Sequence, residues 1–290
     1  MLISCIAHNS SEGNLIVGDD HTALIDCGMA FCAGRTIASV EKALGGRPLD
    51  YILLTHAHYD HVGALPYFRK RWPGLRLAAS EAAAGIMRKD TPRRVIRELA
   101  ATAGARFGEA YEDYDGDDAF FADIILNDGD LTDLGGLSVR ALATPGHTRD
   151  SYCFFVPELE LLLLNETPGV LTPDGGMYPC YLTSYNDAVA STEKCARIKY
   201  RHLSLPHRSV VDAGEVEGFF ERALLTTKAC YAFIRDMSDS GLGEDAMLDA
   251  FYDRYFSETL MMFQPREAFF MNARATIACT LREIAAGPGK

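Results

Sequence analysis

The apolar positions in the first half of the chain fall into short runs, separated by segments in which they recur every three to four residues. Short aliphatic runs bounded by polar or turn residues predict strands at 2–7, 15–17, 23–25 and 51–54. Helical spacing predicts helices at 35–44, which Gly45-Gly46 ends, and at about 63–72, 80–88 and 93–103. An acidic loop is expected over 109–118, where Asp, Glu and Gly crowd together.

The second half of the chain returns to strands and then becomes helical. Strands are predicted at 124–126, 137–143, 152–156, 159–164 and 202–205, with a helix at about 185–199. From 215 to 285 the spacing predicts only helix, in three stretches broken near Ser240-Gly241 and Gln264-Pro265. This order predicts an α+β fold of two packed sheets flanked by helices. We expect one domain over 1–212 and a helical C-terminal subdomain over 213–290.

Composition narrows the class of protein. The chain has 290 residues, 48% of them hydrophobic, and a formal net charge of −12, which disfavours a nucleic-acid partner. Its eight cysteines form no CxxC pair and fit a reducing cytosol. No apolar run approaches the roughly 20 residues of a membrane helix, and the first residues lack the basic start of a secretory signal. We therefore expect a soluble, cytoplasmic protein without membrane contact.

The strongest chemical feature is the segment Thr55-His56-Ala57-His58-Tyr59-Asp60-His61, at the end of the apolar run 51–54. Histidine and aspartate are costly to bury without partners, so three histidines and one aspartate within six residues have little value as packing. A single histidine in this place would more often be structural. Imidazole and carboxylate groups that converge after a strand are the ligands of Zn²⁺ and similar divalent metals. The segment therefore predicts a metal site.

Three further candidate ligands each follow a predicted strand. His147 stands in the turn Thr144-Pro145-Gly146-His147, Glu166 follows the apolar run 161–164, and His207 follows 203–206. Each of them alone is weak, because a histidine at a strand end is often only a surface residue. His202 competes with His207, which is preferred because it ends the strand.

These motifs resemble the metallo-β-lactamase fold superfamily, whose HxHxDH motif is matched in full by residues 56–61. The family's histidine after a Thr-Pro-Gly turn corresponds to His147, and its final histidine to His207. Asp26-Cys27-Gly28 is similar to the Asp-x-Gly after the family's N-terminal strand. The resemblance covers about residues 1–212 and implies a four-layer αβ/βα sandwich.

The resemblance also implies two metal ions and their ligands. One ion would take His56, His58 and His147, and the other Asp60, His61 and His207. Glu166 would bridge the ions, where the family usually has an aspartate after a glycine instead of Asn165-Glu166. That departure can shift the metal separation or weaken one site, and Glu166 can also be an ordinary polar residue. Zinc is preferred, and iron or manganese also suit these ligands.

The implied reaction is hydrolysis by a metal-bridging hydroxide, with Asp60 orienting the nucleophile and relaying its proton. No Gly-x-Ser-x-Gly motif supports a serine hydrolase. The segment 166–207 looks like the branch of quinolone-signal thioesterases, with glyoxalase II more distant, so a small thioester is the expected substrate. Three tyrosines in this segment can contact it or be half-buried packing residues: Tyr178, Tyr181 and Tyr185.

The C-terminal helices would cap the active site in this reading. Candidate pocket walls are Phe219, Phe220, Tyr231 and residues 261–263, although apolar stripes of this kind are as typical of a core or of a homodimer contact. Two other functions stay open. One is hydrolysis of a small phosphodiester, and the other is a non-catalytic binding or regulatory protein that retains the metal.

Overall fold

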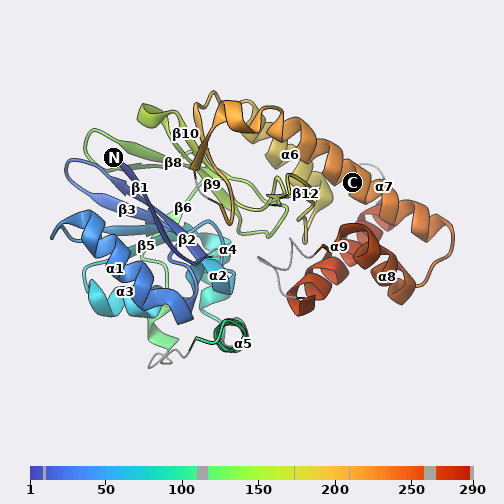
Figure 1. Ribbon diagram of the computed structural model, residues 1–290, viewed down its shortest axis with the longest axis horizontal. Helices are drawn as coiled ribbons and strands as arrows, with labels where there is room; N and C mark the ends of the chain where they lie inside the picture. The colour runs from blue at the N-terminus through green and yellow to red at the C-terminus, as the bar shows by residue number, and fades with distance from the viewer. Residues whose placement is uncertain (9–10, 110–116, 173, 209, 258–265, 288–290) are drawn as a thin grey trace.

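The computed structural model describes residues 1–8, 11–109, 117–172, 174–208, 210–257 and 266–287. Within these residues two large sheets pack face to face (Figure 1). The first sheet contains, in spatial order, β1 (Leu2–His8), β2 (Ser11–Val17), β3 (Thr22–Ile25), β4 (Tyr51–Leu53), β5 (Arg76–Ser80) and β6 (Ile124–Leu126). The second contains β14 (Val210–Asp212), β13 (His202–Ser204), β10 (Leu161–Leu163), β9 (Tyr152–Val156), β8 (Ser138–Ala143) and β7 (Leu131–Asp133).

Helices cover the outer face of each sheet. The first sheet carries α1 (Ala33–Leu44), α2 (Tyr59–Val62), α3 (Leu65–Arg71) and α4 (Glu81–Met87), and α5 (Asp90–Arg106) packs on α2 and α4. The second carries α6 (Tyr185–Ala196) and the start of α7 (Phe219–Asp239). One apolar cluster fills the space between the sheets and two others lie under the outer helices. The predicted α+β fold with four layers is thereby confirmed.

The direction of the strands brings several loops to one edge of the sandwich. β3 and β4 run parallel, with Ile25 paired to Leu53, and β10 and β13 run parallel, with Leu163 paired to Ser204. β8 is antiparallel to β9, which is antiparallel to β10, so β8 and β10 point the same way. Because parallel strands end on the same side, the segments after β3, β4, β8, β10 and β13 gather together.

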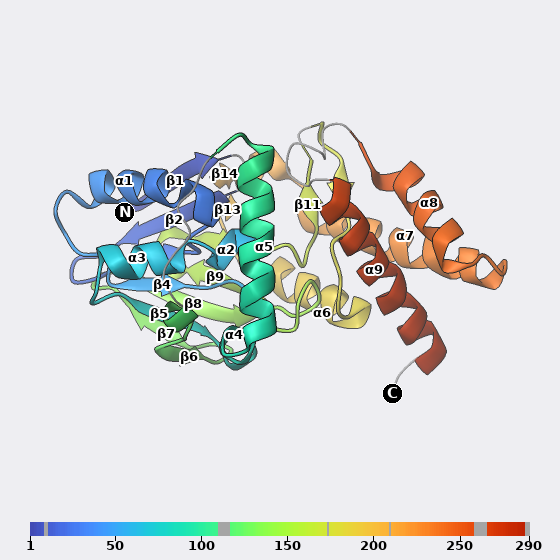
Figure 2. The same cartoon turned by 90° about the horizontal axis from the view of Figure 1, so that it is seen from below.

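The last three helices lie beside the sandwich and pack mainly against one another. α7, α8 (Glu244–Tyr255) and α9 (Arg266–Ala286) share an apolar cluster with α6 and with the small sheet of β11 (Val170–Leu171) and β12 (Met177–Tyr178). In Figure 2, α5 stands between the sandwich and α9. Because this cluster includes residues between 170 and 188, the domain boundary at 212 stays a prediction from the sequence.

The expected elements recur with small shifts of their ends, except for several strands. The structure adds β5, β7, β11, β12 and β14, where no strand was predicted. β5 is a buried strand inside the sheet, but alanine has a low β-propensity, so its Ala78-Ala79 pair gives no clear strand signal in the sequence. The others have only two or three residues. Most of the expected acidic loop, 110–116, lies outside the described residues. In the described part of the chain no helix is long and apolar enough to cross a bilayer.

Candidate metal centre

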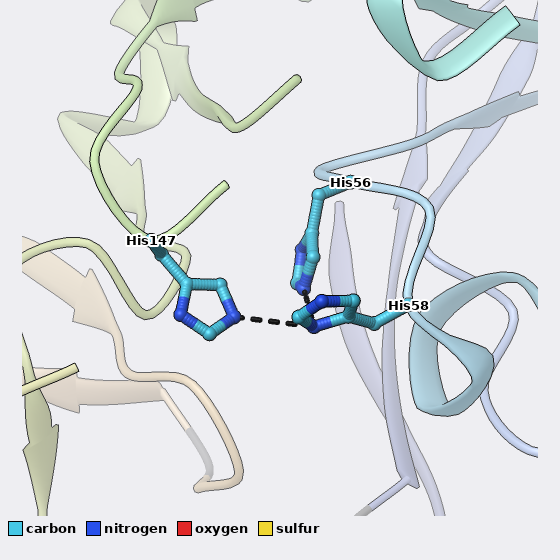
Figure 3. A group of neighbouring side chains, drawn as sticks. All are labelled: His56, His58 and His147. Atoms are coloured by element: carbon cyan, nitrogen blue, oxygen red, sulfur yellow. Dashed lines mark hydrogen bonds between the residues drawn. The ribbon is translucent and has the colours of Figure 1, made fainter. Parts of the chain in front are cut away.

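Three histidine rings meet at the edge where the strands end. His56 and His58 follow β4, and His147 follows β8 in the other sheet. The Nδ1 atom of His58 lies 3.0 Å from Nε2 of His56 and 3.2 Å from Nε2 of His147. Figure 3 shows the three rings turned toward one another. Their ligand atoms are close enough to hold one metal ion.

A second group of ligand atoms lies beside the first. It consists of Asp60, His61 and His207. The buried carboxylate of Glu166 connects the two groups, because its Oε1 lies 2.8 Å from His61 Nε2 and its Oε2 lies 3.7 Å from His56 Nδ1. The Nε2 atom of His207 is 3.0 Å from the same Oε1.

The partners of the outer ring nitrogens fix which nitrogen can bind a metal. His147 Nδ1 lies 2.9 Å from the carbonyl oxygen of Cys180, and His61 Nδ1 lies 2.8 Å from a carboxylate oxygen of Asp26. A proton on each Nδ1 leaves the lone pair of Nε2 directed into the site, which is the usual arrangement behind metal-binding histidines. His61 Nε2 and Glu166 Oε2 are buried and make no hydrogen bond of good geometry within the described residues. Such atoms fit a metal ion well.

Burial and neighbouring charges set the protonation of the site. Burial, with His61 as the next cause, lowers the pKa of His56 well below its ordinary value, and burial lowers the pKa of His147 to about 4. Burial also opposes charge on His61, but Glu166 and Asp26 raise the pKa of His61 well above its ordinary value. Burial raises the pKa of Glu166, yet His61 and His56 together bring it well below its usual range. The site therefore contains an ionised Glu166 beside neutral His56 and His147, while the raised pKa of His61 favours its protonated form.

Residues outside the ligand groups position the loops that carry them. The backbone N–H of Ala57 donates to Asp150 Oδ2 at 2.7 Å, which ties the histidine loop of the first sheet to the second sheet. Asn165 Nδ2 donates to Thr144 Oγ1 at 2.9 Å, and Thr167 Oγ1 donates to the Thr144 carbonyl at 2.8 Å. These bonds hold the segment of Glu166 against the turn that carries His147.

Gly146 is required in that turn. Its φ is +140°, and a Cβ atom there would lie 2.5 Å from Cα of Ala188 on α6. Any larger residue would push the turn away from the helix. His207 has a φ of +58°, an uncommon conformation for a residue other than glycine. Such backbone strain is concentrated at functional sites.

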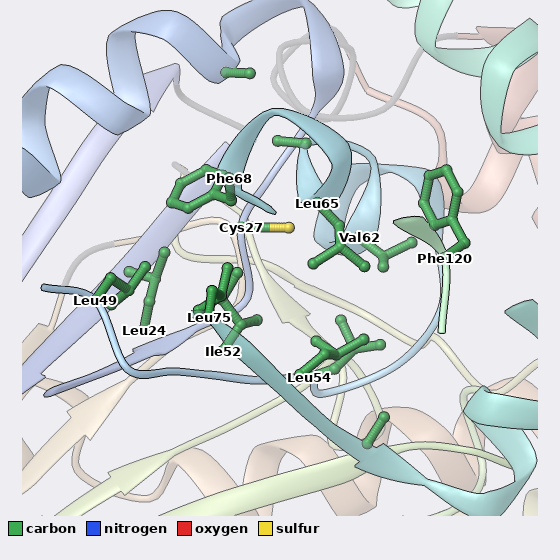
Figure 4. Close-up of a cluster of buried hydrophobic side chains, with 14 of the residues drawn as sticks. Leu24, Cys27, Leu49, Ile52, Leu54, Val62, Leu65, Phe68, Leu75 and Phe120 are labelled. Carbon is green, nitrogen blue, oxygen red and sulfur yellow. The ribbon is translucent and has the colours of Figure 1, made fainter. Parts of the chain in front are cut away.

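The histidine loop is also held by apolar packing on both sides. Leu54 precedes it, and Val62 and Leu65 follow it, and all three are buried in one cluster under the helices of the first sheet (Figure 4). These anchors fix both ends of the loop, so the imidazoles keep their places without the flexibility of an open surface loop.

A cavity of about 240 Å³, the metal-centre pocket, opens over both ligand groups. Its lower part is formed by ligands and its walls are largely apolar, from three parts of the chain: Val95 and Leu99 on α5, Val170 and Tyr178 of the small sheet, and Ala268 and Met271 on α9. Val95 and Met271 are 40% and 50% exposed, unusually high for large apolar side chains. The pocket thus has an apolar mouth between α5 and α9.

Residues 14–207 match the family described as the Metallo-beta-lactamase superfamily. The chain belongs to this superfamily. The matched span contains the six side chains of the two ligand groups and also Glu166. The described residues of the chain contain groups able to hold metal ions.

Individual known proteins are also similar to this chain. A probable metallo-hydrolase of Burkholderia pseudomallei is 35% identical over 150 residues, 49% of this chain and 45% of that protein. An atrochrysone carboxyl ACP thioesterase of Aspergillus fumigatus is 26% identical over 138 residues, 48% of this chain and 24% of that protein. A metallo-beta-lactamase family protein from Thermus thermophilus has a TM-score of 0.61 at 22% identity, covering 100% of this chain and 95% of that chain. The chain thus matches less than half the length of these two curated relatives, while the fold is shared over its whole length.

The three tyrosines predicted to contact the substrate lie in different surroundings. Tyr178 lines the metal-centre pocket, and its buried hydroxyl has no hydrogen-bond partner among the described residues. The hydroxyls of Tyr181 and Thr280 are 2.9 Å apart within the helical cluster, and the ring of Tyr185 stacks on Tyr231 at 4.2 Å. Neither Tyr181 nor Tyr185 lines the metal-centre pocket. His202 pairs with Asp212 at 2.7 Å, away from both ligand groups.

The predicted pocket walls also differ from those of the structure. Phe219 and Phe220 are buried against the second sheet, and Tyr231 packs on Tyr185, so none of the three lines the pocket. Residues 261–263 lie outside the described residues. The walls come instead from α5, α9 and the small sheet of β11 and β12. The apolar residues of the two helices carry no motif that would reveal this position.

Asp26 contacts a ligand histidine, and the sequence did not predict this role. Its carboxylate accepts hydrogen bonds from the backbone N–H and the hydroxyl of Thr55, each at 2.8 Å, besides its contact with His61. Only its place in an Asp-x-Gly segment pointed to it. The parallel pairing of β3 and β4 brings it under the histidine loop.

The Asp26→Asn variant is expected to lower metal affinity or turnover by about 10- to 100-fold, as losing a partner behind a ligand typically does. Asparagine tolerates the φ of +58° at this position, so the change removes charge with little strain. Metal titration and initial rates measure the effect. Asp50→Asn is a matched control, because Asp50 also accepts from a threonine N–H and hydroxyl and lies near a histidine. Equal losses in both variants would contradict the assignment.

Proposed function

We propose that this chain is a dinuclear metal-dependent hydrolase of a small, largely apolar ester, with a thioester as the favoured substrate. The observation that carries the proposal is the contact of Glu166 with both ligand groups, since a carboxylate in that position can serve two ions at once. Zinc is the favoured ion, and iron or manganese suit the same histidine and carboxylate donors.

Two bound divalent ions would lower the pKa of a bound water toward neutrality and polarise the substrate carbonyl. The chain supplies the remaining functions. Asp60 lies at the pocket surface beside His61, 3.9 Å from its Nε2, where its carboxylate can orient the attacking water and accept its proton. The unpaired hydroxyl of Tyr178 can donate a hydrogen bond to the substrate. The apolar walls exclude bulk water, which strengthens these interactions.

The lining of the pocket favours an ester over a phosphodiester. The described residues around it include no Lys or Arg, and its walls are chiefly apolar. The net charge of −12 also disfavours a polyanionic substrate. One relative is named a thioesterase, and this supports the thioester. The cytoplasmic location and a homodimer through the C-terminal helices stay predictions from the sequence.

Elemental analysis and substrate comparison test the function. Full-length protein purified without added metal is expected to hold about two equivalents of zinc, iron or manganese per chain. The loaded protein should hydrolyse S-phenyl thioacetate with a kcat/KM roughly 100-fold above that for bis-p-nitrophenyl phosphate, because the apolar walls favour the neutral substrate. Faster cleavage of the phosphate would replace the proposal with a phosphodiesterase. Protein that holds no metal and takes up none on incubation would overturn the mechanism altogether.

A further inference from the structure

A second cavity joins the metal-centre pocket. This α5 groove, of about 440 Å³, runs between α5 and the segment that follows His147. Four residues line both cavities: His58, Tyr59, Val95 and Leu99. Because the ligand His58 stands where the two cavities join, a substrate with its scissile bond at the ligands can extend into both.

The α5 groove is lined chiefly by apolar side chains, with the charged side chain of Arg149 among them. Ile86, Pro92 and Ile96 line it together with the shared residues of α5. From Thr91 to Leu99 the helix advances eight residues, about 12 Å at the usual helical rise. The groove is therefore long enough for an extended chain of several methylene groups, and its walls favour such a chain over a polar one.

Arg149 supplies the only uncommitted charge of the groove within the described residues. The carboxylate of Asp150, also in the lining, is buried and accepts from Ala57 N–H. Arg149 is exposed, and the described part of the chain offers it no ion pair and no side-chain hydrogen bond. A protein of net charge −12 repels anions in general, so a free guanidinium beside an apolar groove marks a local exception.

We propose that the α5 groove is a second substrate subsite for an apolar chain that ends in an anion, which Arg149 binds. The group on the other side of the scissile carbonyl then lies in the metal-centre pocket. This inference rests on the proposed hydrolase function and specifies its substrate class as an ω-anionic acyl ester. The terminal anion is a carboxylate or a phosphate, since a guanidinium binds both through paired hydrogen bonds.

Matched substrates test the subsite in the full-length, metal-loaded protein. The S-phenyl thioesters of octanoic acid, of octanedioic acid with one free carboxylate, and of 8-phosphonooxyoctanoic acid have chains of equal length and differ at the far end. We expect at least one anionic ester to exceed the neutral ester in kcat/KM by about fivefold, the scale of one charge-assisted contact at a partly exposed site. The ratio for each anion shows which of the two is preferred.

Two substitutions locate the effect. Arg149→Gln should bring the anionic-to-neutral ratio to about one, and Arg149→Glu should invert it. Arg94→Gln is the charge-matched control, because Arg94 faces solvent on α5, pairs with Glu98 at 3.7 Å, and lines neither cavity. Thr91→Trp places a large ring in the α5 groove alone and should raise KM for the eight-carbon esters relative to S-phenyl thioacetate. Equal ratios in the wild type, Arg149→Gln and Arg94→Gln would overturn the subsite.

A binding measurement separates this inference from the proposed function. Calorimetry compares octanedioic acid monoamide with octanamide, neither of which carries a labile thioester. If no ester is hydrolysed but the carboxylate binds more tightly and this preference needs Arg149, the subsite stands and the hydrolase assignment falls. If esters are hydrolysed without any preference for the anion, the subsite falls and the hydrolase assignment stands.

Discussion

The His58→Ala variant is expected to lose hydrolytic turnover by more than about 100-fold, beyond the usual cost of losing a residue behind a ligand. Its Nδ1 is the atom that Nε2 of both His56 and His147 approach, so its removal opens the centre of the three-histidine group. The ring is only half-buried and belongs to no apolar cluster, so folding should persist. Initial rates with S-phenyl thioacetate and metal content per chain measure the loss, and thermal unfolding checks the fold.

His202→Ala provides the matched control for that variant. Like His58, His202 lies at a strand, here in the second sheet, but it pairs with Asp212 on the surface. Its removal should change turnover by less than about twofold, because substitutions on the surface rarely exceed about 0.5 kcal/mol. If His58→Ala retained both its metal and its turnover, the three-histidine group would not be a metal site. If it lost the metal but retained a ligand-binding activity, the chain would be a binding protein.

The Glu166→Gln variant is expected to hold about one metal equivalent instead of two, with turnover lower by about 100-fold. Glutamine preserves the size of the side chain, but it removes the negative charge that offsets two ions in a buried place. It also leaves one oxygen where Glu166 offers two, directed to His56 and to His61 with His207. Elemental analysis after gel filtration, together with initial rates, measures both losses.

Two companion variants sharpen that result. Glu166→Asp keeps the charge but shortens the reach by one methylene, so it should retain more metal than Glu166→Gln. Glu283→Gln is the control: its carboxylate also accepts several hydrogen bonds, among them those from Ser184 Oγ at 3.0 Å and Tyr185 N–H at 2.9 Å, but it caps α6 outside the ligand groups. That change should cost about 1 kcal/mol of stability and no metal. Two equivalents and full turnover in Glu166→Gln would show that Glu166 bridges nothing.

Much of the site could be predicted because its information is local. Residues 56–61 are neighbours in the chain, and the expectation that they meet needs only a strand end. His147, Glu166 and His207 each follow an apolar run, and the parallel direction of β8, β10 and β13 then brings them to one edge. For these residues, the sequence pattern and the direction of the strands both place the ligands at the same edge of the sandwich.

The remainder depends on which elements become neighbours, and pattern alone does not specify this. Asp26 reaches His61 only because β3 pairs with β4, a choice among several strand orders. Amphipathic spacing shows that α7 and α9 each have an apolar face, but not what that face contacts. In the structure, the apolar face at the start of α7 packs on the second sheet, where the ring of Phe220 lies 5.8 Å from that of Tyr200, whereas Met271 of α9 lines the metal-centre pocket.

The origin of the ligands in both sheets links the site to the folding equilibrium. His56, His58 and His61 belong to the first sheet, and His147, Glu166 and His207 to the second. An ion held by both sets is a cross-link across the sandwich, formed only after long stretches of chain have closed into loops. By mass action, an ion at about 100 times its Kd adds about 2.7 kcal/mol to the stability of the native state. Metal occupancy and the stability of the two-sheet sandwich are thus thermodynamically linked. A shortage of metal in the cell would therefore shorten the lifetime of the protein as well as abolish its activity.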